Sequence, residues 1–331
     1  MEEKMTSKER KKFWEVLVSL TGQNIPEECE TLLKTIKYPK KLYRFRKADI
    51  KSLEALRTNR LYFSSAAYYD DPFDSFCSIN WNTVAEGITH ALGDENQRKI
   101  AFNILSQQSG CTIEQVSAFF SSRNINEWIL EGNNIIEQLR KIIQNMQRSI
   151  YFTEKDLNEV LWLKYSDNHT GFALEFDFSP QSLLIDDGLR STSAVNNAKY
   201  YSIYPVYYSN KAYDSTNYVR AVAEEMAASI ISQSQQQSSL TIPPEMYWQI
   251  ERISLIKHKC HEYDKEWRII HPYSKEPLYM SWKPSGVIIG LKAEKPTRDL
   301  IISLSKEAEI SKIYECYIDN KNKLNKRRIR L

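Results

Sequence analysis

The stretch that most constrains the fold lies between residues 41 and 76, where signals for a strand, a helix, a second strand and a turn follow one another. Residues 41–46 (KLYRFR) alternate apolar and polar side chains, which predicts a half-buried strand. Apolar residues then recur at helical spacing over 50–56, and Asp49 stands before them as a suitable N-cap. Residues 61–63 (LYF) are again β-prone. This β-α-β unit is the frame onto which we expect the later segments to dock.

A turn rich in carboxylates and aromatic rings follows at residues 68–74 (YYDDPFD). Three carboxylates in a turn that contains proline are costly to bury together. Two interpretations stay open: the turn lies at a ligand site, or it is a solvated turn whose aromatic rings fill the core.

The remaining chain alternates between helical and strand-like segments. Helical spacing dominates residues 1–38, about 80–147 and 213–259, whereas 149–153, 171–178, 204–208, 263–271, 286–291 and 312–318 are strand-like. Within 171–178, Phe172, Leu174, Phe176 and Phe178 face one way, and Ala173, Glu175 and Asp177 face the other. This order predicts an α+β (mixed α/β) fold with a central mixed β-sheet, helical insertions and an N-terminal helical preface.

The same pattern predicts one main domain. We expect a helical preface over residues 1–40, a single α+β domain over 41–320 with helical inserts at about 80–147 and 213–259, and a basic tail over 321–331. The tail is either a solvated terminus or a contact for nucleic-acid phosphates.

Charge and cysteine content narrow the class of protein. The net charge of +3 creates only a weak overall field, which gives no strong attraction to nucleic acid. Five scattered cysteines without a CxxC pair argue against a disulfide framework or a zinc site, and no metal is expected. The N-terminus lacks a signal-peptide core, and no apolar run is long enough to span a membrane. A cytoplasmic protein without a membrane partner is therefore expected.

Six short motifs occur in a characteristic order: Leu42-Tyr43-Arg44, Leu61-Tyr62-Phe63-Ser64-Ser65, Asp71-Pro72-Phe73-Asp74, Leu161-Trp162, Tyr165-Ser166-Asp167-Asn168-His169-Thr170-Gly171-Phe172 and Lys265-Glu266-Trp267-Arg268. In this order they resemble the bacterial family called domain of unknown function 2971, over roughly residues 41–320. Asp70 stands where that family usually has asparagine before Asp-Pro-Phe. The family name supplies no chemistry, so the function is argued from the residues.

One constellation also resembles the ADP-ribosyltransferase pattern. Arg44 lies on the first strand, Ser64 and Ser65 end the second, and Asp264 and Glu266 share one face of the expected strand 263–271. The resemblance implies NAD as the cofactor, with Arg44 on its pyrophosphate. It also implies that Glu266 binds the ribose 2′-OH and stabilises an oxocarbenium-like centre, while Asp264 orients or deprotonates the acceptor.

Further candidates surround this constellation. Tyr62 and Trp267 would stack on the cofactor, and Asp71 would contact it, although most aromatic residues of a chain like this fill the core. His169, in a polar turn, is a candidate general base or a simple turn hydrogen-bonder. A structural alternative also remains for Glu266, which can pair with Arg268 on the same strand face and with Arg44 or Arg46.

The expected function is that of an intracellular bacterial effector of the toxin or phage-defence type. It would handle a small-molecule nucleotide as an NAD-dependent ADP-ribosyltransferase-like enzyme and act on a nucleic-acid or protein acceptor. One alternative is a metal-dependent nuclease built on Asp70, Asp71 and Asp74 with Glu175 or Asp177. Another is a non-catalytic module that binds a ligand or partner through a recognition surface of Tyr68, Tyr69, Trp162 and Trp267.

Overall fold

The computed structural model describes residues 5–65, 74, 77–84, 95–122, 124, 127, 130, 133, 134, 137, 138, 148–177, 203–224, 247–271 and 279–330. Its central sheet is formed by β1 (Lys41–Arg46), β3 (Ser64–Ser65), β5 (Arg148–Thr153), β6 (Phe172–Asp177), β7 (Ile203–Pro205), β11 (Glu266–His271), β13 (Gly286–Ile289), β14 (Ile313–Ile318) and β15 (Leu324–Arg328).

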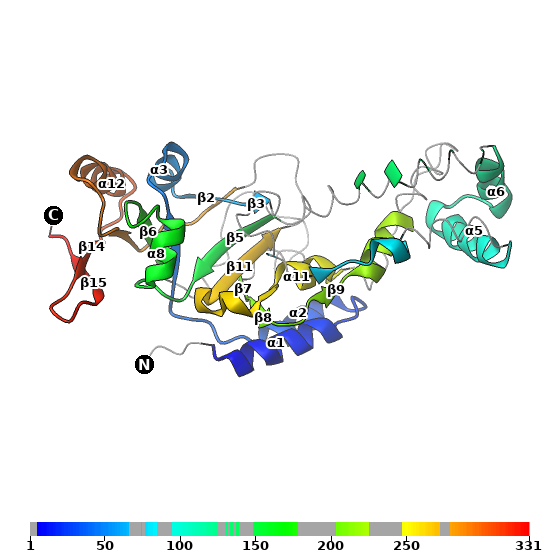
Figure 1. Cartoon of the computed structure of the whole chain (residues 1–331), viewed down its shortest axis with the longest axis horizontal. Coiled ribbons are helices and arrows are strands. Elements are labelled where there is room, and N and C mark those ends of the chain that lie inside the picture. The colour runs from blue at the N-terminus through cyan, green and yellow to red at the C-terminus, as the bar shows by residue number, and fades with distance from the viewer. Residues whose placement is uncertain are drawn as a thin grey trace.

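These nine strands lie in the order β15-β14-β13-β6-β1-β5-β11-β7, with β3 paired to β5 (Figure 1). The pair β13–β14 is parallel, whereas β6 is antiparallel to both of its neighbours, so the sheet is mixed. Together with the helices around it, this sheet confirms the predicted α+β class with a central mixed sheet.

The helices are α1 (Ser7–Ser19), α2 (Ile25–Leu33), α3 (Ile50–Arg57), α5 (Glu95–Ser109), α6 (Ile113–Ser121), α8 (Glu159–Tyr165), α11 (Gln249–Ser254) and α12 (Lys295–Glu307), with a 3₁₀ helix η4 at Lys259–Asp264. Smaller strand pairs join β2 (Arg60–Tyr62) to β12 (Tyr279–Ser281), β8 (Tyr207–Ser209) to β10 (Ile256–His258), and β4 (Cys77–Ser78) to β9 (Tyr213–Asp214). None of the helices in the described ranges is both long and apolar enough to cross a membrane.

Local sequence explains where several helices begin. The Asp49 carboxylate accepts a 2.7 Å hydrogen bond from the Ser52 amide, which confirms the predicted N-cap of α3. At α1, Thr6 and Glu9 each accept from the other's backbone N–H, forming a capping box. The N-terminal segment predicted to be helical is therefore α1 and α2.

The two faces of the sheet carry different cores. The larger core joins the sheet to α1, α2 and α12, through side chains such as Phe13, Leu17, Leu32 and Ile301. The smaller core, on the other face, packs Leu161 and Trp162 of α8 against Tyr43, Phe45, Ala173 and Ile288. Phe172, Leu174 and Phe176 belong to the larger core and Ala173 to the smaller one, as the alternation predicts; Phe178 lies outside the described residues.

The turn between α8 and β6 is held by close backbone contacts. Asp167, Asn168 and His169 have φ angles of 51°, 54° and 69°, a left-handed run that L-residues seldom adopt. A Cβ on Gly171 would lie 2.1 Å from the Arg46 carbonyl oxygen, and one on Gly290 would lie 2.2 Å from the His169 carbonyl oxygen. Only glycine at these two positions lets the turn sit against the ends of β1 and β13.

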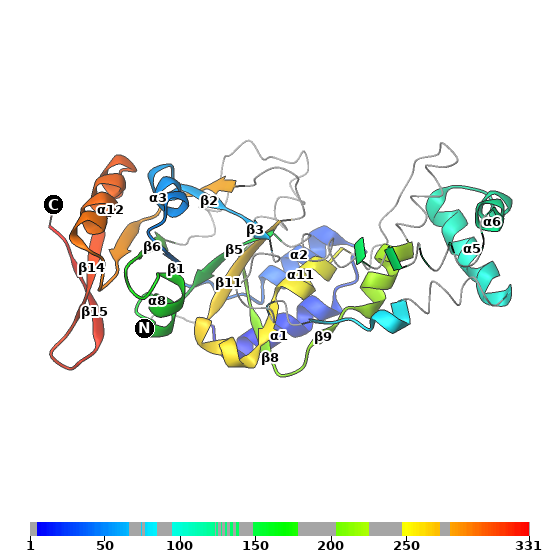
Figure 2. The ribbon, with the colours of Figure 1, turned by 45° about the horizontal axis from the view of Figure 1, so that its top comes forward.

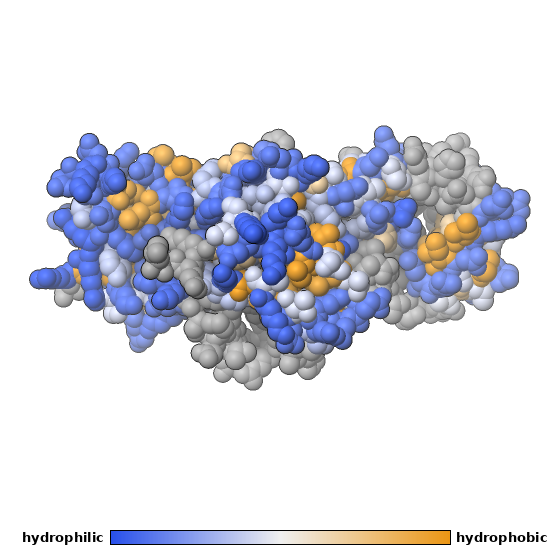
Figure 3. All heavy atoms as spheres, turned by 90° about the horizontal axis from the view of Figure 1, so that it is seen from below, coloured by the Kyte–Doolittle hydropathy of each residue, from blue (hydrophilic) through white to orange (hydrophobic). Residues whose placement is uncertain are grey.

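The helices α5 and α6 form a separate unit with a small core of Phe102, Leu105, Cys111 and Val116. Figures 1 and 2 show this unit at the end of the molecule opposite β14 and β15. Seen from below, the surface is mostly hydrophilic, with separate apolar patches at both ends and near the middle of the molecule (Figure 3).

The basic segment at the C-terminus differs from expectation, because most of it is not a tail. Residues Leu324–Arg328 form β15, which pairs antiparallel with β14 along its length and is the edge strand of the sheet. Lys326 anchors it by ion pairs with Asp156 at 2.8 Å and the fully buried Glu175 at 3.2 Å. One buried and one partly exposed carboxylate thus hold a segment whose composition alone is typical of a solvated terminus.

Candidate functional site

The central sheet opens between β1 and β5. These two strands pair only at Tyr43 and Thr153, whereas the same edge of β5 pairs with β3 at Ser149 and Arg148. On its other edge, β1 stays paired with β6 over its full length. Beyond Tyr43, therefore, β1 separates from β5. No ladder of backbone hydrogen bonds closes the gap between them, which is bordered by side chains and backbone.

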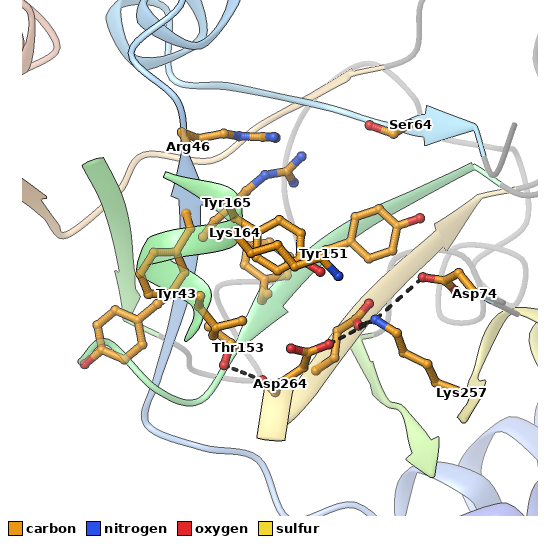
Figure 4. A pocket seen from close by; sticks show the side chains of 15 residues that line it. Tyr43, Arg46, Ser64, Asp74, Tyr151, Thr153, Lys164, Tyr165, Lys257 and Asp264 are labelled. Carbon is orange, nitrogen blue, oxygen red and sulfur yellow. Dashed lines mark hydrogen bonds and ion pairs between the residues drawn. The ribbon is translucent and has the colours of Figure 1, made fainter. Parts of the chain in front are cut away.

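A cavity of about 240 Å³ occupies this opening. It is lined by Tyr43, Arg44, Phe45 and Arg46 of β1, Ser64 of β3, Tyr151, Phe152 and Thr153 of β5, Leu161, Lys164 and Tyr165 of α8, and by Asp74, Lys257, Asp264 and Glu266. In Figure 4, Arg46 and Ser64 lie on one side of the cavity, while Asp264, Lys257 and Asp74 lie on the other.

Arg44 and Glu266 reach this cavity from opposite faces of the sheet. Thr153 pairs with both Tyr43 and Glu266, so these three side chains share one face. Arg44, the next residue on β1, points to the other face, where its guanidinium lies 6.0 Å from the centre of the Phe152 ring. Arg44 and Glu266 line the same cavity because the sheet opens between β1 and β5.

The acidic side of the cavity is a cluster of buried ion pairs. Lys257 Nζ lies 3.0 Å from Asp264, 3.1 Å from Glu266 and 3.8 Å from Asp74. Arg268 contacts Glu266 at 2.6 Å and Asp74 at 2.8 Å. The pairing of Glu266 with Arg268 that the sequence left open as a structural alternative is therefore present, and Arg44 takes no part in it.

Burial and charge act differently on the two candidate carboxylates. Burial opposes ionisation of Glu266, but Arg268 and Lys257 outweigh it and hold its pKa at about 2. Burial raises the pKa of Asp264, with Lys257 opposing and the Glu266 charge adding to the rise. Both Glu266 oxygens accept hydrogen bonds, whereas Asp264 Oδ1 is buried with no partner among the described residues. Asp264 is the carboxylate with an oxygen free for a ligand.

The strand predicted over 263–271 is shorter than expected. It begins at Glu266, because residues Lys259–Asp264 form η4 and Lys265 adopts a left-handed φ of 46° at its end. The prediction that strand alternation brings Asp264 and Glu266 together is therefore wrong. Their shared partner Lys257 brings them together instead, and the Thr153 hydroxyl donates a 2.6 Å hydrogen bond to the Asp264 carbonyl.

The basic side of the cavity consists of Arg44, Arg46 and Lys164. Arg44 is only 4% exposed, and its one hydrogen bond in the described structure runs from Nη2 to the Tyr62 carbonyl at 3.3 Å; Nη1 has no partner there. Burial, then repulsion from Arg46, lowers the pKa of Arg44. Burial lowers the pKa of Arg46 to about 10, against the opposing charge of Asp49. Among the described residues, no carboxylate forms an ion pair with Arg44 or Arg46, so this side is suited to an anion.

Aromatic rings border the space between the two charged sides. Tyr43, Phe45, Tyr151, Phe152 and Tyr165 all line the cavity. Burial raises the pKa of Tyr165, so this residue is a neutral phenol at physiological pH. Rings between a cationic and an anionic wall suit a ligand that joins a planar group to phosphate.

The structure brings together four of the residues proposed from the sequence: Arg44, Ser64, Asp264 and Glu266 line the cavity. Tyr62 contributes its backbone carbonyl to Arg44, while its ring packs on Tyr279.

Three other proposed residues, Ser65, Trp267 and His169, do not line the cavity. Ser65 is buried opposite Arg148. Trp267 belongs to the larger core and donates from Nε1 to Glu154 at 2.7 Å. His169 stacks on Trp162 with ring centres 5.9 Å apart. Asp71 lies outside the described residues.

Among the charged lining residues, sequence reasoning did not propose Lys257, Arg46 or Lys164 as site residues. Lys257 lies on β10, inside a region predicted to be mostly helical, and no motif marks it. Arg46 was considered only as an ion-pair partner, although its position two residues after Arg44 on a strand places both on one face.

The proposed metal cluster has no counterpart among the residues that the structure describes, where no group of three or more His, Cys, Asp or Glu is arranged to hold a metal ion. Asp74 belongs to the cluster around Lys257, and Glu175 pairs with Lys41 at 2.7 Å and with Lys326. Asp70 and Asp71 lie outside the described residues.

The fold and cavity define an α+β protein with an open central sheet and a bipolar site at the opening. The family model described as "Protein of unknown function (DUF2971)" matches residues 161–269, which confirms the resemblance to that family. The matched part includes most of α8, all of β6 and β10, and the residues Lys257, Asp264 and Glu266. No curated protein and no solved structure matches the chain.

Proposed function

We propose that this chain is a cytoplasmic nucleotide-handling enzyme, an NAD-dependent ADP-ribosyltransferase-like effector of the toxin or phage-defence type, whose site is the cavity between β1 and β5. The observation that carries the proposal is that Arg44 and the carboxylates of Asp264 and Glu266 line one cavity although about 220 residues separate them. All five cysteines are free thiols, which agrees with a reducing compartment.

The residues present fit such a ligand. The unpartnered Nη1 of Arg44 offers hydrogen bonds to a phosphate oxygen, and Arg46 adds a second positive charge. Tyr151 and Tyr165 offer ring faces, and the free Oδ1 of Asp264 accepts a hydroxyl proton. The cavity of about 240 Å³ lies just below the roughly 300–1,000 Å³ typical of small-molecule sites, so it matches part of a dinucleotide.

Each charged group then has a role in group transfer. NAD supplies an ADP-ribosyl group, whose bond to nicotinamide breaks with the electron pair leaving on nicotinamide as the bond to the acceptor forms. Asp264, whose Oδ1 is free, takes the proton that the acceptor loses. Glu266, kept ionised by Arg268 and Lys257, stabilises positive charge at the reacting carbon through its field.

Release of nicotinamide tests the proposal. The purified chain is incubated with NAD, alone and with nucleic-acid or protein acceptors, and free nicotinamide is measured by chromatography. We expect Asp264→Asn and Glu266→Gln each to lower the release rate about 100-fold or more. Glu175→Gln, which also removes a buried, lysine-paired carboxylate but outside the cavity, serves as the control for folding. Absence of release by the wild type, or undiminished release by Glu266→Gln, would end the proposal.

Neither alternative is favoured by a specific observation. The described residues contain no arranged metal ligands to support a nuclease. Trp162 and Trp267, two of the rings proposed for a recognition surface, are fully buried, so they offer nothing to a partner.

A further inference from the structure

The C-terminal end of the sheet carries the positive charge of the molecule. Residues 306–330 contain eight Lys or Arg and four Asp or Glu, a net charge of +4, against +3 for the whole chain. The rest of the chain is therefore close to neutral, and the positive charge is concentrated in residues 306–330 although the overall net charge is small.

Carboxylates do not neutralise all of these cations. Lys312, Lys326 and Arg327 pair with Asp177, Glu175 and Glu315. Lys306, Lys321, Lys323, Arg328 and Arg330 are exposed and form no ion pair in the described structure. Asp319, in the hairpin turn, accepts hydrogen bonds from the Lys321 and Lys323 amides, which leaves both side chains free.

The unpaired cations follow the outer edge of the sheet. Lys306, Arg328 and Arg330 line an open groove of about 900 Å³ between the end of α12 and the end of β15. The lining also includes Ser311, Ile310, Ile329 and one carboxylate, Glu309, which pairs with Lys283 at 2.9 Å. Lys321 and Lys323 lie in the turn at the opposite end of β15. Five residues of edge strand span roughly 17 Å, so the two groups of cations form a track along β15. Figures 1 and 2 show this hairpin projecting from the sheet at one end of the molecule.

Protection of an exposed edge explains only part of this arrangement. Lysine on an edge strand prevents pairing with other chains, but that needs charges on the strand itself. Here three of the five cations lie in the turn or on α12, and a fourth, Arg330, follows the strand. Cations spaced along a track, rather than gathered at a point, match a polymer with regularly spaced negative charges.

We propose that this basic track, formed by Lys306, Lys321, Lys323, Arg328 and Arg330, binds the phosphate backbone of a nucleic acid. Such contacts set position and affinity without reading sequence. The inference goes beyond the proposed function, because binding at the track requires neither NAD nor the cavity.

Fluorescence anisotropy with labelled single-stranded RNA, single-stranded DNA and duplex DNA of mixed sequence tests the track over a range of salt concentrations. Five phosphate contacts predict a slope of log affinity against log salt of about −3.5 for single strands. The triple variant Lys306→Gln, Arg328→Gln, Arg330→Gln is expected to bind at least 10-fold more weakly and to flatten that slope by about 2.

A matched triple variant, Lys8→Gln, Lys12→Gln, Lys211→Gln, removes the same charge from exposed positions on α1 and between β8 and β9, and is expected to change affinity less than 2-fold. The proposal is overturned if none of the three nucleic acids binds at low salt, if both triple variants weaken binding equally, or if polyglutamate competes as well as nucleic acid at equal charge. Release of nicotinamide without added nucleic acid is measured in parallel. Nicotinamide release without nucleic-acid binding would support the proposed function and reject the basic track. Nucleic-acid binding without nicotinamide release would support the basic track and reject the proposed function.

Discussion

Nη1 of Arg10 donates a 2.9 Å hydrogen bond to the carbonyl of Glu266, 256 residues further along the chain. The same guanidinium donates to the Val206 carbonyl at 2.8 Å and forms a 2.7 Å ion pair with Glu154. Helix α1 thus contacts the backbone of Glu266, the first residue of β11. The Ser7 hydroxyl, on the same helix, donates a hydrogen bond to Glu262 on η4. The N-terminal helix is therefore tied to both segments that carry the acidic side of the cavity.

Arg10→Ala is expected to destabilise the protein by about 3–5 kcal/mol, because it leaves the buried Glu154 charge without its ion-pair partner. Lys11→Ala, on the exposed face of the same helix, is expected to change stability by less than about 0.5 kcal/mol. Urea unfolding followed by circular dichroism measures both. Similar stability of the two variants would contradict the anchoring role of Arg10.

Arg44→Met and Arg268→Met are expected to change the free energy of unfolding in opposite directions. Arg44 is buried with no carboxylate partner among the described residues, so an apolar side chain of similar length should raise the free energy of unfolding by about 1 kcal/mol. Arg268→Met leaves Glu266 and Asp74 without one of their two cations and should lower that free energy by about 3 kcal/mol or more. Denaturant titration of both variants decides this. A large loss of stability in Arg44→Met would mean that Arg44 is a structural residue rather than a ligand-binding one.

Acid should destabilise the protein partly through Glu266. Its folded pKa of about 2 lies below the ordinary value of 4.5, so its contribution to stability is present above pH 4.5 and is lost as the pH falls toward 2. The raised pKa of Asp264 acts the other way, since protonation of that residue favours the folded form. We expect the wild type to lose more unfolding free energy than Glu266→Gln between pH 4.5 and about 2. An equal loss of unfolding free energy in the two proteins would show that the pKa of Glu266 is not lowered in the folded state.

Gly171→Ala and Gly290→Ala should each destabilise the protein by about 3 kcal/mol or more, because the new methyl group would overlap a backbone carbonyl that cannot move aside. Gly286→Ala is the matched control, since its Cβ would meet the nearest atom at 3.1 Å, and a smaller loss is expected. Thermal melting of the three variants measures the difference. Equal melting temperatures would show that the turn between α8 and β6 can shift.

Local pattern determined much of the secondary structure. The alternation in β1 and β6, the Asp49 cap and the helical spacing of α1 and α2 each depend on neighbours in the chain, and each is present as expected. The limits of β11 could not be obtained this way, because an alternating sequence does not reveal that Lys265 turns left-handed after η4. Likewise, His169 and Trp267 have the residue types of a binding site but pack in the interior, since packing depends on residues far along the chain.

The amino-acid sequence alone determined the α+β class, the family resemblance and the residue types of a candidate site in which arginines face carboxylates. Only the tertiary structure decided that the sheet opens between β1 and β5, that Lys257 joins Asp264 to Glu266, and that the basic segment is an edge strand. The physical reason is that strand pairing and buried ion pairs link residues distant in the chain. Such links depend on the packing of the whole molecule, so the sequence around Lys257 or Arg46 contains no motif that marks either residue as part of the site.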